Sequence, residues 1–275
     1  MYHDPEADAS TCLHHNLMID APLLERLAAR HGLGSASIVL EAAGEPEAGA
    51  SLAARLPLYP ASMIKVPIAI ALALQCEARI LNLDDERLVD VSNITTNDAP
   101  SPFIAGCRAT LGQLARAMLS ASDNVATNVL IDVLGRETIG PACAPFGLVE
   151  TAVRRKLSGS LPLIEDPFAT GRNAHPARDA AMLFHEIERR ARSGTDFIYD
   201  ALAAQVWNDK LSRGLRAGDR FAHKTGDTDD VSHDGGILTL EDGRRFVLVV
   251  YTSLPAGPET DPRFGDFARE LRALL

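Results

Sequence analysis

The chain has 275 residues, with 27 lysines and arginines against 37 aspartates and glutamates, and its formal net charge is −10. Hydrophobic residues make up 46% and charged residues 23%, a composition typical of a globular protein that argues against disorder. Its acidity disfavours nucleic acid and anionic lipid as partners, and its longest apolar run, residues 66–74, is too short to span a membrane.

The first third of the chain mixes helix and strand. Residues 1–19 are polar and acidic, so we expect a flexible N-terminus that lacks the basic and apolar segments of a secretory signal. Apolar residues at helical spacing predict a helix between Asp20 and Gly32. β-branched and apolar residues favour a strand over residues 35–42, and a shorter strand is predicted near residues 50–55.

The middle of the chain shows a helical pattern from residue 62 to about 134, interrupted by a connector at 92–106. Residues 154–176 contain scattered glycine, proline and serine without periodicity, which predicts a long irregular loop. Loops of that length are often functional. Helical spacing returns over residues 177–192.

The last part of the chain predicts strands at residues 221–226, 235–240 and 244–254 and a helix near 262–275, with a hairpin turn at Glu241–Gly243. The whole order predicts an α/β (α+β) fold, in which an antiparallel sheet is flanked by helices and a second lobe is all-helical. We expect residues 20–58 and 206–275 to form the sheet lobe and residues 59–205 to form the helical lobe.

Cysteine and histidine spacing indicates no metal site. The four cysteines, Cys12, Cys76, Cys107 and Cys143, form no CxxC pair, which favours buried free thiols over a disulfide or a zinc site. The histidines lack a metalloprotease-like spacing, so we expect no metal and no cofactor. We interpret His223 and His233, on either side of the predicted strand end, as structural imidazoles, and a pH-responsive role is the alternative.

Three short motifs are candidates for catalysis: Ser62–Lys65 (SMIK), Ser122–Asn124 (SDN) and Lys224–Gly226 (KTG). Each is common by chance when taken alone. Their context carries more information, because the first opens an apolar helix, the second lies in the helical middle and the third ends a strand.

The residue types in these motifs fit nucleophilic acyl transfer. A serine hydroxyl needs an adjacent base, and Lys65 lies one helical turn from Ser62. Burial and the like charge of Lys224 would lower the pKa of Lys65, as a base requires. Backbone N–H groups of Ser62, at a helix start, and of Asp227 could hold an oxyanion.

The SDN motif supplies the remaining polar groups. Ser122 could pass the proton to the leaving group, and Asn124 could bond either Lys65 or a substrate amide. For Asp123 we expect a structural role, in which its side chain caps a helix or bonds the backbone.

The ordered trio resembles the active-site serine penicillin-recognising family, especially class A β-lactamases. Residues 59–72, 110–135, 215–226 and 246–253 extend the resemblance, which covers roughly residues 20–275. It implies a β-lactamase/transpeptidase-like fold with Ser62 as nucleophile, Lys65 as base and Ser122 as proton relay. It also implies a set of substrate-binding residues: Asn124, Lys224, Thr225, Gly226 and Asp227.

Two departures from the family pattern concern turnover and substrate charge. The family's water-activating glutamate would fall roughly 36 residues after the SDN serine, at Ser158, and the nearest acids are Glu150 and Glu165. We take Glu165 as the candidate catalytic carboxylate. A family arginine that binds the β-lactam carboxylate would fall at Asp234, in an acidic run that includes Asp227, Asp229 and Asp230. Arg213 and Arg216 are candidate substitutes.

The resemblance therefore implies a serine hydrolase that opens a β-lactam amide through a Ser62 acyl-enzyme. One alternative is a D,D-peptidase or esterase-like hydrolase on the same fold, and another is a non-turnover penicillin-binding or sensor module. The expected partner is a small-molecule β-lactam or an acyl-D-Ala-D-Ala-like substrate, bound by a monomer. The family expectation for location is periplasmic or secreted, although the chain shows no signal peptide.

Overall fold

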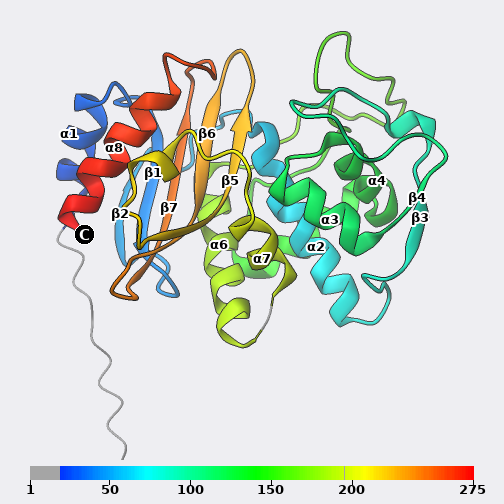
Figure 1. Cartoon of the computed structure of the whole chain (residues 1–275), viewed down its shortest axis with the longest axis horizontal. Helices are drawn as coiled ribbons and strands as arrows, with labels where there is room; N and C mark the ends of the chain where they lie inside the picture. The colour runs from blue at the N-terminus through cyan, green and yellow to red at the C-terminus, as the bar shows by residue number, and fades with distance from the viewer. Residues whose placement is uncertain (1–18, 195) are drawn as a thin grey trace, which may run out of the picture.

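A five-stranded antiparallel sheet stands between two layers of helices in the computed structural model, which describes residues 19–194 and 196–275 (Figure 1). The expected flexible N-terminus, except for its last residue, and Cys12 lie outside the described residues. The strands of the sheet are β1 (Ser37–Ala42), β2 (Gly49–Leu52), β5 (Arg220–Asp227), β6 (Ser232–Thr239) and β7 (Arg245–Thr252).

The strand order is β2-β1-β7-β6-β5, so both ends of the chain build one sheet. The predicted hairpin at residues 241–243 is confirmed, because it joins β6 to β7 and the Leu240 N–H donates to Arg244 O at 2.8 Å. Strand β1 pairs with β2 on one side and with β7, the last strand of the chain, on the other. Strand β5 is left at an edge of the sheet, with one side unpaired.

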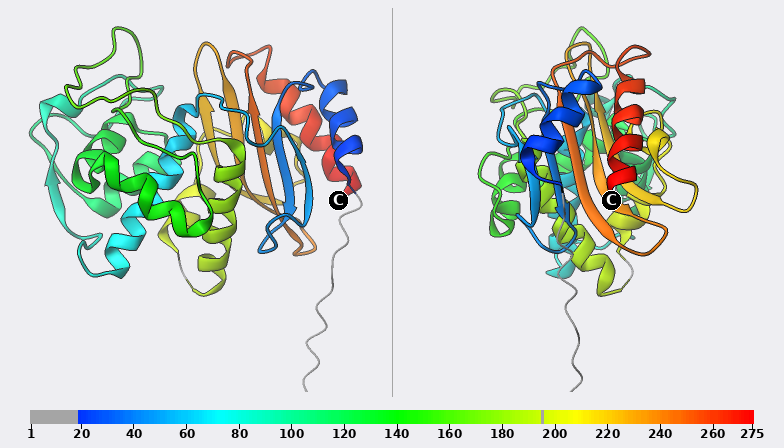
Figure 2. Two further views of the ribbon diagram at one scale, coloured as in Figure 1. Left: turned by 180° about the vertical axis from the view of Figure 1, so that it is seen from behind. Right: turned by 90° about the vertical axis from the view of Figure 1, so that its left-hand side faces the viewer.

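Two terminal helices, α1 (Ala21–Arg30) and α8 (Asp261–Leu274), cover the outer face of the sheet (Figure 2). The α1 helix begins at Asp20, whose carboxylate accepts the Leu23 N–H at 2.8 Å, an N-cap that satisfies a free backbone donor. Side chains of β7 alternate between the two faces, so that Leu248 packs outward and Val249 packs inward. Both faces of the sheet are therefore buried.

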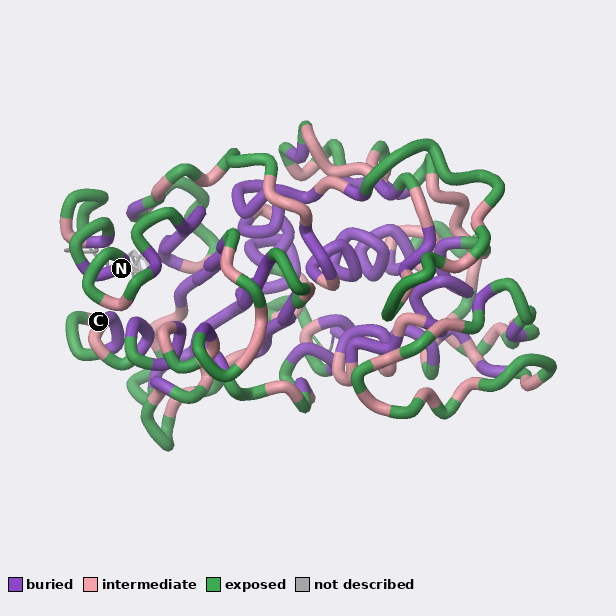
Figure 3. The backbone as a smooth tube through the Cα atoms, turned by 90° about the horizontal axis from the view of Figure 1, so that it is seen from above, coloured by how far each residue is buried: buried purple, intermediate pink, exposed green. Residues whose placement is uncertain are grey.

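The inner face is covered by helices from the middle of the chain, of which the last two make the main contacts with the sheet and the others pack behind them. These are α2 (Lys65–Glu77), α3 (Leu111–Ser120), α4 (Asn124–Leu134), α5 (Arg136–Cys143), α6 (Ala177–Arg192) and α7 (Phe197–Ala203). Helix α2 is apolar on all sides, and every residue from Lys65 to Ala73 is buried, which makes it the central helix of this layer (Figure 3). Helix α6, which spans the predicted residues 177–192, contacts both α2 and the sheet. The proposed lobe boundaries stay a prediction.

Some elements were not expected from the sequence. Strands β3 (Glu86–Leu88) and β4 (Arg108–Thr110) form a two-stranded ribbon within the helical layer. Within the described residues there are also four short 3₁₀ turns: η1 (Ala61–Ile64), η2 (Val91–Asn93), η3 (Ala144–Phe146) and η4 (Leu211–Gly214). Residues 154–176 are irregular as predicted, and an isolated bridge between Ala152 and Ala174 joins the two ends of this loop.

The three described cysteines are free thiols, as expected. Only Cys143 is buried, where burial raises the pKa of its thiol to about 12. Cys76 and Cys107 are half-buried, so the expectation of full burial is wrong for them, because both lie at the margin of the core rather than inside it. None of the helices in the described part of the chain combines the length and the apolarity that crossing a bilayer requires.

Candidate active site

Ser62 and Lys65 lie at the junction of η1 and α2, beneath the edge strand β5. The Lys65 Nζ atom is 2.9 Å from Ser62 Oγ, as the one-turn spacing predicts. Lys65 is fully buried, whereas part of the surface of Ser62 remains open to solvent. Ala61, directly before the serine, has a φ of +46°, a costly conformation for a residue with a side chain.

The SDN motif forms the connection between α3 and α4 and faces Lys65. Lys65 Nζ lies 2.6 Å from Ser122 O, 3.0 Å from Ser122 Oγ and 2.8 Å from Asn124 Oδ1. Ser122 also has a positive φ, of +60°. The expected structural role of Asp123 is confirmed, because it is the N-cap of α4 and accepts the Ala126 N–H at 2.7 Å.

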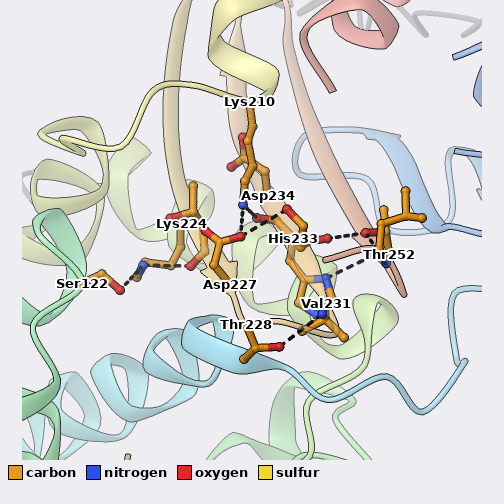
Figure 4. Close-up of polar contacts among 12 residues, drawn as sticks. Ser122, Lys210, Lys224, Asp227, Thr228, Val231, His233, Asp234 and Thr252 are labelled. Atoms are coloured by element: carbon orange, nitrogen blue, oxygen red, sulfur yellow. Dashed lines mark hydrogen bonds and ion pairs between the residues drawn. The ribbon is translucent and has the colours of Figure 1, made fainter. Parts of the chain in front are cut away.

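Lys224 reaches the same point from β5. Its Nζ donates to Ser122 Oγ at 2.9 Å and to Thr225 O at 2.9 Å (Figure 4). The Ser122 hydroxyl therefore lies between the two lysine amines, at hydrogen-bond distance from each. The three motifs, far apart in the chain, come together around this hydroxyl.

Both lysines are buried without a carboxylate in direct contact among the described residues. Burial, and then the neighbouring Lys224, lower the pKa of Lys65 well below its ordinary value. Burial also lowers the pKa of Lys224 to about 7. Neither amine forms an ion pair with a carboxylate of residues 19–194 or 196–275, and the more distant carboxylates that raise the two pKa values offset only part of the cost of burial.

The surroundings of Lys65 suit a neutral amine. Four acceptor atoms surround Nζ, and two of them, Ser122 O and Asn124 Oδ1, can only accept. The orientation of the Asn124 amide follows from its Nδ2, which donates to Thr96 O at 3.1 Å. A neutral amine has two N–H groups for these acceptors and one lone pair left for a hydroxyl hydrogen. That lone pair can take the proton of Ser62.

The free edge of β5 carries the second expected oxyanion donor. The Thr228 N–H donates to Val231 O at 2.9 Å, and in an antiparallel ladder the bonded pairs alternate, so the Asp227 N–H points to the free edge. Gly226 allows close approach to η1, because a Cβ there would lie 3.0 Å from Pro60 O and 3.2 Å from Met63 N. Residues 226 and 227 thus lie beside the start of the serine helix.

The irregular loop approaches the site at residues 157–160. Asn128 of α4 holds the Leu157 backbone from both sides, accepting its N–H at 2.8 Å and donating to its carbonyl at 3.0 Å. Gly159 packs on the connector residue Thr96, whose carbonyl oxygen would lie 2.0 Å from a Cβ at position 159. This segment contains no acidic residue.

Glu165 does not join the cluster around Ser122. It is exposed, and its carboxylate forms no hydrogen bond or ion pair with any residue that the structure describes. The water-activating role of Glu165 stays a prediction.

The acidic run separates into exposed and buried members. Asp229 and Asp230 are exposed in the β5–β6 turn. Asp234 is fully buried and accepts from the Leu211 N–H at 3.0 Å, and its other oxygen lies 2.7 Å from His223 Nδ1. The structural role expected for His223 is therefore confirmed.

His233 is likewise a structural imidazole, since its Nε2 lies 2.8 Å from Tyr59 O and burial lowers its pKa to about 4. The two arginines proposed as substitutes lie elsewhere. Arg213 is exposed and its side chain lies over Gly265 of α8, and Arg216 pairs with Glu241 at 3.6 Å.

The cation that does lie beside β5 is Lys210, which sequence analysis missed. Its Nζ pairs with the Asp227 carboxylate and donates to His233 O at 3.1 Å. No motif marks Lys210 in the sequence. Only the fold, through η4 and the end of β5, brings it to this position.

Comparison with solved structures shows the same fold. A mutant of PBP-A in an acyl-enzyme complex with penicillin G shares 22% identity with the chain, at a TM-score of 0.76 over 93% of this chain and 97% of that one. A β-lactamase from Sphaerobacter thermophilus shares 24% identity, at a TM-score of 0.76 over 93% and 98%. The TLA-3 extended-spectrum β-lactamase shares 15%, at 0.76 over 92% and 98%.

Among curated proteins, none matches the sequence. The profile of the β-lactamase enzyme family, however, matches residues 22–274, nearly the whole chain. The resemblance and the fold class expected from the sequence are thereby confirmed. The protein belongs to the β-lactamase enzyme family.

Proposed function

We propose that this family member opens β-lactam amides by forming an acyl-enzyme on Ser62. The observation that carries the proposal is the position of the Lys65 amine, 2.9 Å from Ser62 Oγ and fully buried among acceptors that suit its neutral form. A serine hydroxyl becomes a competent nucleophile when such a base lies within hydrogen-bond distance.

The proposed acylation step uses groups already in contact. Lys65 Nζ takes the Ser62 hydroxyl proton while Oγ attacks the β-lactam carbonyl carbon. The resulting oxyanion accepts from the N–H groups of Ser62 and Asp227. When the ring C–N bond breaks, Ser122 Oγ protonates the leaving nitrogen and is itself reprotonated from Lys65. Lys224, which donates to Ser122 Oγ, stabilises negative charge in this region.

Substrate binding is assigned to the free edge of β5 and to Asn124. Asn124 Oδ1 orients Lys65, and its Nδ2 faces the connector carbonyl of Thr96. Thr225 would contact the substrate along the edge of the strand, and Gly226 keeps that edge close to the serine helix. These roles support an extended substrate that pairs with β5 by its backbone-like amide groups.

Release of the acyl group is proposed to be slow. A carboxylate must activate the attacking water in the family mechanism, but the loop segment 157–160 beside Asn128 has none. Glu165, the candidate substitute, is exposed and without contacts to the described cluster. These observations favour a penicillin-binding protein or a D,D-peptidase over an efficient β-lactamase.

The test follows a chromogenic cephalosporin by absorbance and by intact protein mass. We expect one equivalent of colour in a rapid burst, a matching adduct on Ser62 and a slow steady state. The Ser62→Ala variant should give neither burst nor adduct. Absence of an adduct on the folded wild type would overturn the proposed acylation.

Rapid multiple turnover without an accumulating adduct would show an efficient hydrolase and overturn the slow release. Incubation with an acyl-D-Ala-D-Ala peptide addresses the second function. Release of D-alanine that depends on Ser62 would assign the D,D-peptidase activity.

A further inference from the structure

The edge strand β5 carries a charged side chain on each of its two faces, Lys224 on one and Asp227 on the other. Side chains alternate along a strand, so Lys224 lies on the inner face, next to Ser122, and Asp227 lies on the outer face. A substrate along the free edge, as the proposed function requires, meets the strand from the side and is exposed to both charges.

On the outer face, Asp227 covers the cation behind it. Its Oδ1 accepts from Lys210 Nζ and, at 3.1 Å, from Ser232 Oγ (Figure 4). The Lys210 side chain is only 5% exposed, whereas that of Asp227 is 36% exposed. A molecule arriving at the edge therefore meets the carboxylate first, and the ammonium is already engaged.

This pair acts electrostatically on the site itself. Burial has the largest effect on the pKa of Lys224. The next largest effects come from Asp227, which raises this pKa, and from Lys210, which lowers it. A second exposed carboxylate, Asp98 of the connector, raises the pKa of both Lys224 and Lys65. The predicted site thus has carboxylates from both the sheet and the helical side within electrostatic range.

We propose that Asp227 is a specificity-determining residue, which holds Lys210 away from the substrate and selects acyl donors that are uncharged or cationic where they meet the end of β5. The proposal rests on the proposed acylation of Ser62 and names its substrate class. An anionic group at this place must either lie against the Asp227 carboxylate or displace it from Lys210. Either alternative costs binding energy, since like charges repel and the existing pair is partly desolvated.

The experiment compares two probes that differ in one charge, penicillin G and its uncharged methyl ester. The second-order rate of Ser62 acylation is measured for each by intact mass, at pH 6 so that Lys224 is mainly protonated. In Asp227→Asn, which keeps an oxygen acceptor for Lys210, we expect the ratio of the anion rate to the ester rate to rise about tenfold. Dividing by the ester rate removes effects on the shared chemistry of Ser62 and Lys65.

Asp229→Asn is the matched control, because it removes the same charge from an exposed position two residues further on, in the β5–β6 turn, without a contact to Lys210. Its ratio should equal that of the wild type. Asp227→Ser serves as a second variant if the amide alters folding, and it should raise the ratio in the same direction. Equal ratios in the Asp227 and Asp229 variants would overturn this inference while leaving the acylation of Ser62 in place. No adduct with either probe on the folded wild type would overturn both.

Discussion

The two faces of β5 treat buried positive charge in opposite ways. On the inner face, Lys224 and the adjacent Lys65 have no carboxylate partner among the described residues, and burial lowers both pKa values. On the outer face, Lys210 pairs with Asp227, and His223 faces Asp234. The difference indicates which buried amines can take part in proton transfer. Lys224, which has no ion-pair partner and a pKa of about 7, can exchange its proton near neutral pH, whereas Lys210 is held in place by its ion pair.

The largest expected effect is that of Lys65→Met, which removes one of the two buried amines that have no ion-pair partner among the described residues. Losing the base should reduce the acylation rate by about 100- to 10,000-fold. Thermal stability should change little, because removing the cost of burying an amine offsets the loss of its hydrogen bonds to Ser122 O and Asn124 Oδ1. The checks are intact-mass kinetics and a melting curve.

Lys156→Met is the control for that variant, since Lys156 is also buried but pairs with Asp132 at 2.7 Å, outside the Ser122 cluster. It should acylate normally. A Lys65 variant that reacts as fast as the control would remove the base from the proposed mechanism.

On the outer face of β5, removing a partner should lower the stability of the fold rather than the rate of acylation. Asp234→Ala leaves His223 and the Leu211 N–H without their acceptor, and unsatisfied buried groups cost about 1–3 kcal/mol each. Urea unfolding measures the change. Asp266→Ala, which breaks an exposed pair with Arg269, should cost less than about 1 kcal/mol. Equal effects in the two variants would show that the Asp234 contacts contribute little.

The pH dependence of acylation should reveal the charge on Lys224, because only an anionic substrate depends on its ammonium. The pKa of Lys224 is about 7, so its ammonium is present below pH 7 and is lost as the pH rises through that value. Acylation by an anionic β-lactam should therefore fall about tenfold from its plateau by pH 8, as the protonated fraction falls. An uncharged ester should lack this descending limb. A limb of equal size with both probes would assign it to another group.

The smallest effect is expected for Glu165→Gln. Its carboxylate is exposed and contacts no part of the cluster, so the rate of acyl-enzyme loss should change by less than about twofold. The rate is followed by intact mass after removal of free β-lactam. A slowing of tenfold or more would give Glu165 the water-activating role that the resemblance suggests.

Sequence periodicity predicted the long elements well, because each buries one continuous face. Helix α6 occupies the predicted residues 177–192, and the β6–β7 hairpin turns at the predicted residues. Strands β3 and β4 have three residues each, too few for alternation to show against the helical pattern around them. The positive φ values at Ala61 and Ser122 were equally hidden, since neither residue type indicates that conformation.

For the site, the motifs identified the residues that the structure brings together around Ser122. Their catalytic roles are still proposals. Motif spacing did not predict the surroundings of the outer face of β5. Lys210 belongs to no motif, and Arg213 and Arg216 were the candidate substitutes for the family arginine. The turn of η4 decides this, because it directs Lys210 under β5 and Arg213 over α8.

The strand order has a consequence for the synthesis of the protein. Strand β7 is the last strand made, yet it lies between β1 and β6 and joins the two ends of the chain. The platform that holds Lys224 over Ser62 therefore cannot close until almost the whole chain has left the ribosome, since non-local pairing must wait for both partners. A covalent β-lactam label on Ser62 would accordingly mark finished molecules and leave truncated or half-folded ones unlabelled.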